Sequence, residues 1–306
     1  MKRFAAEFAA LQPPCSARVP RKLTDFIFGE SMNHIRQTSY VLGIAAILVA
    51  TALPANAALT EEQLAKLAQN PVGNLISVPF QYNGNLNFGP EKGTQNILNI
   101  QPVIPISVND DWNIITRTIL PVVWLPALSP NDNSVRGISD LQFTAFLSPA
   151  NPGSWIWGIG AITQAPTHSN AKLGNDNWGL GPSFVVLHLE KGSPWVYGVL
   201  VNNIWSLGSK EGSPSYNNGL IQPFLNYNLP SGTYLTTSPI ITVNWKASGS
   251  NQWTVPIGGG VGKIFHFGKL PVNMQVAAYY NVARPDFSAN WQVRAQMQFM
   301  FPKDLL

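Results

Sequence analysis

The fold is decided by residues 289–301, which read Ala-Asn-Trp-Gln-Val-Arg-Ala-Gln-Met-Gln-Phe-Met-Phe. Apolar side chains occupy every second position from Trp291 to Phe301, and polar ones occupy the positions between them, with Met300 as the exception. A period of two places alternate residues on opposite faces of a β-strand. The apolar face would pack on a core in a soluble sandwich. In an outer-membrane barrel it would face lipid, and the amides would face the lumen.

The composition excludes several classes of protein. The 306 residues are 45% hydrophobic and only 11% charged, whereas an average chain has roughly 25% charged residues. The net charge of +4 is spread without a basic run, so nucleic acid is not expected as a partner. The only cysteine, Cys15, precedes the predicted mature chain. Disulfides, cysteine catalysis and cysteine metal sites are therefore not expected there.

Residues 32–57 have the pattern of a secretory signal peptide. A basic start with Arg36 is followed by an apolar run and then by Ala55-Asn56-Ala57, which has the form of a cleavage site. The apolar run is shorter than the roughly 20 residues that a spanning helix needs. We therefore expect cleavage after Ala57, with an uncleaved anchor or a buried core helix as the alternatives. Residues 1–31 fit no targeting pattern, and we interpret them as a non-native or disordered extension upstream of the true start.

One helix and about twelve strands are predicted in the mature chain. The helix covers residues 58–71, where Thr60 is a plausible N-cap and Pro71 ends the helix. We place it on the periplasmic side, as a candidate plug for the lumen. The barrel itself is predicted over residues 72–303, followed by a tail at 304–306. The strands are expected at 74–84, 95–107, 111–125, 137–148, 154–165, 177–190, 194–207, 218–229, 233–246, 252–267, 270–283 and 289–301.

The strand lengths and connections favour an all-β, antiparallel up-and-down transmembrane barrel. Most of the strands are longer than the five or six residues usual in soluble proteins. Tight turns rich in Gly, Pro, Asn and Asp alternate with longer polar loops, as between periplasmic turns and outer loops in bacteria. Prolines inside the strands disagree with this reading, because proline cannot donate to a ladder. They predict either bulges or strands divided in two, at Pro102, Pro105, Pro121, Pro182, Pro223, Pro239 and Pro256.

The tryptophans lie near the ends of the predicted strands, where two aromatic girdles would meet the membrane interfaces. They are Trp112, Trp155, Trp157 and Trp195 at tight turns, and Trp124, Trp178, Trp205, Trp245, Trp253 and Trp291 at long loops. A soluble core would tend to place tryptophan in mid-strand. This placement favours the membrane.

Alternation in several strands predicts a lumen of carboxamides with scattered positive charge, including Lys263. The candidate solute-lining residues are Arg117, Gln222, Asn226, Asn244, Lys246, Asn273, Gln275, Gln292, Arg294 and Gln296. Phe299 and Phe301, close to the end of the chain, are expected to be the signal read by the barrel-assembly machinery. Gly258-Gly259-Gly260 with Gly262 precedes a strand, so we interpret it as a close-packed or bent strand instead of a phosphate loop.

Several segments together resemble one bacterial family. They are residues 74–81, 220–230, 238–240, 244–245, 253–263, 269–273 and 279–282. The family is the outer-membrane barrel group named for the meta-pathway of phenol degradation, whose members are often labelled neuromedin U or transporter. The resemblance covers residues 58–303. It implies a twelve-stranded type of barrel that passes small, often apolar, solutes, and it supplies no catalytic residues.

We therefore expect a bacterial outer-membrane channel or transporter for small neutral or apolar solutes. Arg117 and Arg294 would extend its selectivity to weakly anionic molecules. Its expected partners are outer-membrane lipid, the assembly machinery and an unidentified solute, and no catalytic residue, metal or cofactor is predicted. One rival is a lipid-modifying enzyme in the same barrel, using His168 and Ser169, although adjacent residues rarely form such a site. The other rival is a soluble secreted β-sandwich or adhesin.

Overall fold

The structure, a computed structural model, describes residues 59–210 and 212–302. The predicted extension at 1–31, the signal peptide at 32–57 and the tail at 304–306 lie outside the described residues. One α-helix, α1 (Glu61–Ala68), precedes the strands, and a short 3₁₀ helix spans Gly249–Asn251. The strands are β1 (Ile76–Phe88), β2 (Gly93–Ile100), β3 (Val103–Ser107), β4 (Trp112–Leu125), β5 (Val135–Ile138), β6 (Leu141–Pro149), β7 (Trp155–Ala165), β8 (Gly179–Leu189), β9 (Trp195–Ser206), β10 (Asn217–Asn228), β11 (Thr233–Thr237), β12 (Ile241–Asn244), β13 (Trp253–Phe267), β14 (Leu270–Ala283) and β15 (Trp291–Phe301). No helix in the described ranges is long and apolar enough to cross a membrane.

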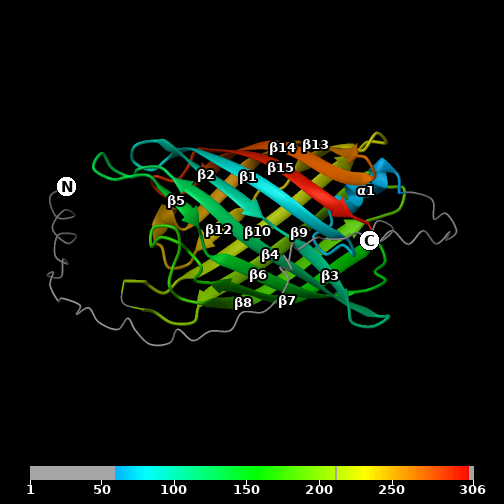
Figure 1. Ribbon diagram of the computed structural model, residues 1–306, viewed down its shortest axis with the longest axis horizontal. Coiled ribbons are helices and arrows are strands. Elements are labelled where there is room, and N and C mark those ends of the chain that lie inside the picture. The colour runs from blue at the N-terminus through cyan, green and yellow to red at the C-terminus, as the bar shows by residue number, and fades with distance from the viewer. Residues whose placement is uncertain (1–58, 211, 303–306) are drawn as a thin grey trace, which may run out of the picture. The chain divides into compact units, whose positions relative to one another are not determined.

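The strands form one antiparallel sheet that closes on itself (Figure 1). Apart from β2 and β3, β5 and β6, and β11 and β12, consecutive strands pair with each other. The ring closes where β1 pairs with β15, from Ile76 opposite Phe301 to Leu86 opposite Trp291. Three pairs of consecutive strands, β2 with β3, β5 with β6, and β11 with β12, run in the same direction and share one position each in the wall. We call each position in the wall a stave, so the fifteen strands make twelve staves. The predicted twelve-stranded barrel is confirmed, and its single closed sheet differs from the two packed sheets of a sandwich.

The in-strand prolines have different effects. Pro102 and Pro239 lie in the gaps between β2 and β3 and between β11 and β12, where the ladder needs an N–H that proline lacks. Pro256 lies at a register shift between β13 and β14, which is a bulge. The other four remain within named strands. Both expected consequences of proline therefore occur, and the number of staves is unaffected because the chain resumes the same direction after each gap.

The connections alternate in length as expected. At one end of the barrel they contain two to five residues, and at the other end four to thirteen. We call these the tight-turn end and the long-loop end. Gly232 and Gly268 at the tight-turn end have φ of 71° and 62°, a left-handed conformation that glycine adopts without a steric penalty.

The alternation in β15 sorts the side chains between two environments. Trp291, Val293 and Met297 are exposed on the outer wall, whereas Arg294 and Gln298 are buried inside. Met300, the exception to the polar set, also points inward and packs with Leu64 of α1. The exception therefore marks the place where the inside of the barrel is apolar.

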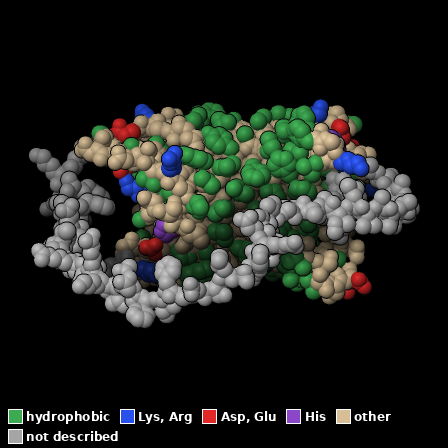
Figure 2. Space-filling model, viewed as in Figure 1, with side chains coloured by type: hydrophobic (Ala, Val, Ile, Leu, Met, Phe, Trp, Pro, Cys, Tyr) green, Lys and Arg blue, Asp and Glu red, His purple; other side chains and the backbone are tan. Residues whose placement is uncertain are grey.

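The outer wall has an apolar belt between two polar ends (Figure 2). Exposed large side chains in this belt include Phe143, Ile159, Phe184, Leu225, Val261 and Val276. The charged side chains in this view lie mostly toward the ends of the barrel. An apolar exterior around a polar interior reverses the arrangement of a soluble barrel and suits lipid as the surrounding solvent.

Candidate functional site in the barrel lumen

The helix α1 packs into the tight-turn end of the barrel. Thr60 is its N-cap, and the Thr60 side chain and Gln63 form a capping box, which confirms the predicted start of the helix. Its apolar face, with Leu64 and Ala65, packs on the inward side chains Tyr234, Ile264 and Met300. Lys66, although buried, pairs with Glu62 at 2.7 Å, so its charge is compensated within the helix.

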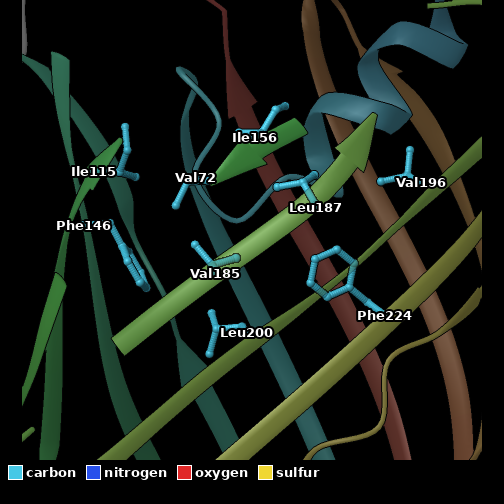
Figure 3. Close-up of a cluster of buried hydrophobic side chains, with 9 residues drawn as sticks. All are labelled: Val72, Ile115, Phe146, Ile156, Val185, Leu187, Val196, Leu200 and Phe224. Carbon is cyan, nitrogen blue, oxygen red and sulfur yellow. The ribbon is translucent and has the colours of Figure 1, made fainter. Parts of the chain in front are cut away.

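The segment that follows α1 crosses the lumen. The side chains of Gln69 and Asn228 exchange two hydrogen bonds, of 2.8 and 3.1 Å. Val72 then packs among inward side chains on the opposite wall (Figure 3), which are Ile115, Phe146, Ile156, Val185, Leu187, Val196, Leu200 and Phe224. Two apolar clusters therefore hold residues 61–75 inside the tight-turn end of the barrel.

Next to this segment, inside the barrel, lies a polar cavity of about 150 Å³. Residues 67–71 of the helix and the following segment form part of its lining. The remaining lining comes from inward side chains of the wall, some of them apolar, such as Leu200 and Phe224, and others carboxamides, namely Gln81, Gln101, Gln222, Gln275, Gln296 and Gln298. Carboxamides donate and accept hydrogen bonds without carrying charge. Such a surface suits a small polar solute.

Arg294 is the more buried of two arginines in this cavity, at 2% exposure. Its guanidinium donates to Asn83 Oδ1 at 3.2 Å, to the Ser238 carbonyl at 2.9 Å and to Gln292 Oε1 at 3.0 Å. It also lies 4.8 Å from the centre of the Tyr279 ring, a cation–π distance. Neutral groups therefore fix this charge in place.

Arg117, the second arginine, is only half-buried and has fewer partners. Within the described chain, its one side-chain hydrogen bond is to Gln101 Oε1, at 2.6 Å. A guanidinium has five N–H donors, so most of those on Arg117 are free for a solute. No Asp or Glu among the described residues lines the cavity. The cavity therefore contains two positive charges without a carboxylate.

Seven of the ten lumen candidates line this cavity. They are Arg117, Gln222, Asn226, Asn273, Gln275, Arg294 and Gln296. Gln292 lies beside it and accepts the bond from Arg294. Asn244 and Lys246 are exposed beyond it at the long-loop end, where Lys246 donates to Ser215. Lys263 is a wrong prediction, because it shares the outward face of β13 with Val261 and Phe265.

Other residues of the cavity were not predicted from the sequence. Gln81 and Gln101 belong to interrupted or proline-containing strands, where the alternation is hardest to follow. Gly262 has the close approach that the glycine run predicted, since a Cβ there would lie 2.2 Å from the Tyr234 ring. Tyr234 in turn donates to Asn273 Oδ1 at 2.8 Å. The glycine thus makes room for an inward tyrosine at the edge of the cavity.

A second polar cluster joins the loops at the long-loop end. His168 Nδ1 lies 2.7 Å from Asp140 and its Nε2 lies 3.2 Å from Asp176. Asp140, in the gap between β5 and β6, also accepts from the Asn175 backbone N–H through its side-chain carboxylate, at 2.7 Å. Tyr216 donates to the Asn177 carbonyl, and burial, with the charge of Asp140, raises the pKa of Tyr216 to about 12. The Tyr216 hydroxyl therefore stays a donor at physiological pH.

This cluster changes the interpretation of His168 and Ser169. His168 is largely buried between two carboxylates. The Ser169 hydroxyl accepts from the Ile138 backbone N–H at 3.0 Å. Each side chain is thus held by different partners, in an arrangement that ties loops together. Asp140 and Asp176 form no recognisable sequence motif with His168, so the sequence does not predict this arrangement.

The tryptophans lie at the ends of the strands, each at or within two residues of a strand end. Several form edge-on aromatic pairs along the wall. The ring centroids of Trp195 and Tyr227 lie 4.8 Å apart, and those of Trp245 and Trp253 lie 5.6 Å apart. Most of them are exposed, with Trp155 at 56%. Their exposure is a cost in water and an advantage at a membrane interface.

The closed twelve-stave barrel with an apolar exterior is the fold class of outer-membrane β-barrels. Among solved structures, the chain is similar to an outer membrane channel from Pseudomonas putida F1, with 19% identity over 76% of this chain and 97% of that chain and a TM-score of 0.55. At a lower TM-score of 0.40, it is also similar to outer membrane phospholipase A from Escherichia coli, with 13% identity over 79% of this chain and 98% of that chain. The β-domain of a Bordetella autotransporter is similar at a TM-score of 0.41, with 12% identity over 74% of this chain and 100% of that chain. The chain matches no family model and no curated protein sequence. At 19% identity, the similarity to the channel concerns the fold alone.

Proposed function

We propose that this protein is a bacterial outer-membrane channel for small polar solutes that are neutral or weakly anionic. The observation that carries the proposal is the cavity with two arginines and a carboxamide lining inside a closed barrel. A lumen with fixed positive charge attracts anions and repels cations. The channel from Pseudomonas putida F1 with a similar fold supports this proposal.

The proposed orientation places the tight-turn end in the periplasm and the long-loop end outside. Barrels of this kind have short periplasmic turns and longer outer loops. The two sets of tryptophans would then lie at the two interfaces of the outer membrane. A signal peptide cleaved after Ala57 would supply the export that this location needs.

We also propose membership of the barrel family named for the meta-pathway of phenol degradation, on the quoted segments. That resemblance implies solutes that are often apolar. The lining of the lumen favours a narrower class of solutes, because its carboxamides would lose their hydrogen bonds to water beside an apolar solute. A polar aromatic molecule, such as a phenol or a small aromatic acid, satisfies both the resemblance and the lining.

Membrane location is tested by fractionation and by electrophoresis with and without heating. We expect the protein in the outer-membrane fraction, with an unheated band that migrates differently from the boiled one, because closed barrels resist detergent unfolding. Purified protein in planar bilayers should then show discrete conductance steps. Recovery in the soluble periplasm with no heat-dependent mobility would end the barrel proposal.

Phe299 and Phe301 are proposed to be read by the barrel-assembly machinery. Both face the outer wall of β15, and Phe299 contacts Phe80 of the closing partner β1, with ring centroids 6.0 Å apart. Replacing both with serine should reduce the heat-modifiable fraction in cells severalfold. The matched control is Phe143→Ser, which removes an outer-wall phenylalanine away from the seam between β1 and β15. Normal assembly of the double variant would exclude the recognition role.

A further inference from the structure

The outer wall contains one charge in an unexpected place. Lys263 is exposed on β13, on the same face as Val261 at 42% and Phe265 at 41% exposure. Its neighbours across the ladder are Thr233 of β11 and Met274 of β14. A lysine on the lipid face of a barrel is unfavourable unless its ammonium finds a polar partner.

Among the residues that the structure describes, no protein group neutralises Lys263. None of the ion pairs and side-chain hydrogen bonds in the described ranges involves its ammonium. Its only specific contact there is with the Phe265 ring, whose centre lies 5.7 Å from Nζ, within the range of a cation–π interaction. The charge is therefore available to a ligand from outside the chain.

A shallow groove runs beside Lys263 on the outer wall. Its volume is about 470 Å³, and it crosses β13, β14 and β15. The outward side chains along it are Val261, Phe265, Met274, Val276, Ala295 and Met297. Ala295 is small and stands between Val276 and Tyr82 across the ladders, which leaves a depression in the wall. The groove is apolar along its length and carries one cation.

We propose that this groove binds an anionic glycerophospholipid, with an acyl chain along the groove and the phosphate at Lys263. This inference rests on the proposed membrane location. Lys263 lies four residues before the end of β13 at the tight-turn end, so in the proposed orientation the ligand belongs to the periplasmic leaflet. The charge complementarity between one ammonium and one phosphate selects an anionic headgroup over a neutral one.

The test uses the purified full-length barrel in detergent, titrated with lipid and observed by native mass spectrometry. The probes are phosphatidylglycerol, zwitterionic phosphatidylethanolamine and lipopolysaccharide. Wild-type protein should retain one phosphatidylglycerol in preference to phosphatidylethanolamine. Lys263→Met, which is apolar and of similar length, should reduce phosphatidylglycerol retention about five-fold, the effect of one basic side chain beside anionic lipid. Lys263→Arg should restore it.

Lys269→Met is the matched control, because Lys269 is exposed in the turn after β13 and outside the groove. It should retain the lipid as wild type does. Equal retention of phosphatidylglycerol by Lys263→Met and wild type would overturn the site, because it would mean that the Lys263 ammonium contacts only water. Preference for lipopolysaccharide would overturn the leaflet assignment. Heat-shift electrophoresis on the same samples separates these results from failure of the barrel proposal, because a true barrel keeps its shift in every variant.

Discussion

Deletion of residues 59–70 is expected to raise the single-channel conductance severalfold. The helix α1 and the segment after it fill the tight-turn end of the lumen, and residues 67–71 form part of the lining of the polar cavity. Without them the cavity would open directly to the periplasmic side. The closed ring of twelve staves does not depend on this segment, because each strand is paired by other strands. Planar-bilayer recordings give the measurement.

The matched control for the deletion is Glu61→Ala, which changes an exposed residue and leaves the helix in place. Its conductance should equal that of wild type. Heat-shift electrophoresis confirms that the deleted protein still forms a barrel. Unchanged conductance in a folded deletion variant would show that the helix does not block the channel.

Whether α1 moves during conduction is a separate question with its own experiment. Gln69 and Asn228 exchange hydrogen bonds, so cysteines at these positions can be joined by a short thiol crosslinker. Cys15, the only natural cysteine, lies outside the predicted mature chain, which keeps the background free of thiols. If the helix leaves its site when the channel opens, crosslinking should abolish conductance and reduction of a cleavable linker should restore it. Conductance that survives complete crosslinking would identify a static constriction.

The sequence predicts the barrel well because one physical constraint repeats along the whole chain. Every stave must present one face to the lumen and one to the outside, so residues such as Val293 and Arg294 alternate without help from distant contacts. The same holds for the N-cap at Thr60, which depends on residues three positions away. Local patterns of this kind are visible in a single sequence.

The candidate site is less predictable, because its residues meet across the lumen. Arg294 bonds to Asn83, which lies opposite it across the seam but 211 residues earlier in the chain, and to Ser238, with two staves between them, and no spacing rule links them. Lys263 was misplaced because it lies between Gly262 and Ile264, and glycine gives no information about which face is inside. The buried position of His168 depends on Asp140, at the gap between β5 and β6, which no periodicity marks.

Arg117→Gln is expected to weaken the preference of the channel for anions, with the charge of Arg294 remaining in the cavity. Arg117 lines the cavity with one side-chain hydrogen bond in the described chain, so its charge can act on a solute. At about 8 Å and an effective dielectric constant of about 20, one charge contributes about 2 kcal/mol, or roughly thirty-fold in relative occupancy by an anion. The measurement is the reversal potential in a potassium chloride gradient, which should move toward the value of a non-selective pore.

Arg136→Gln is the control for charge alone, because Arg136 is exposed on β5 and does not line the cavity. Its reversal potential should match that of wild type. Arg294→Gln should act differently from Arg117→Gln, since it also removes donors to Asn83, Ser238 and Gln292 and the contact with Tyr279. A lost bond to a buried polar group, here Asn83, destabilises by about 1–3 kcal/mol, so the Arg294 variant should unfold at a lower temperature in the heat-shift assay. A reversal potential unaffected by Arg117→Gln would mean that permeating ions do not pass this cavity. The candidate site would then lie elsewhere in the barrel, even though the fold is unchanged.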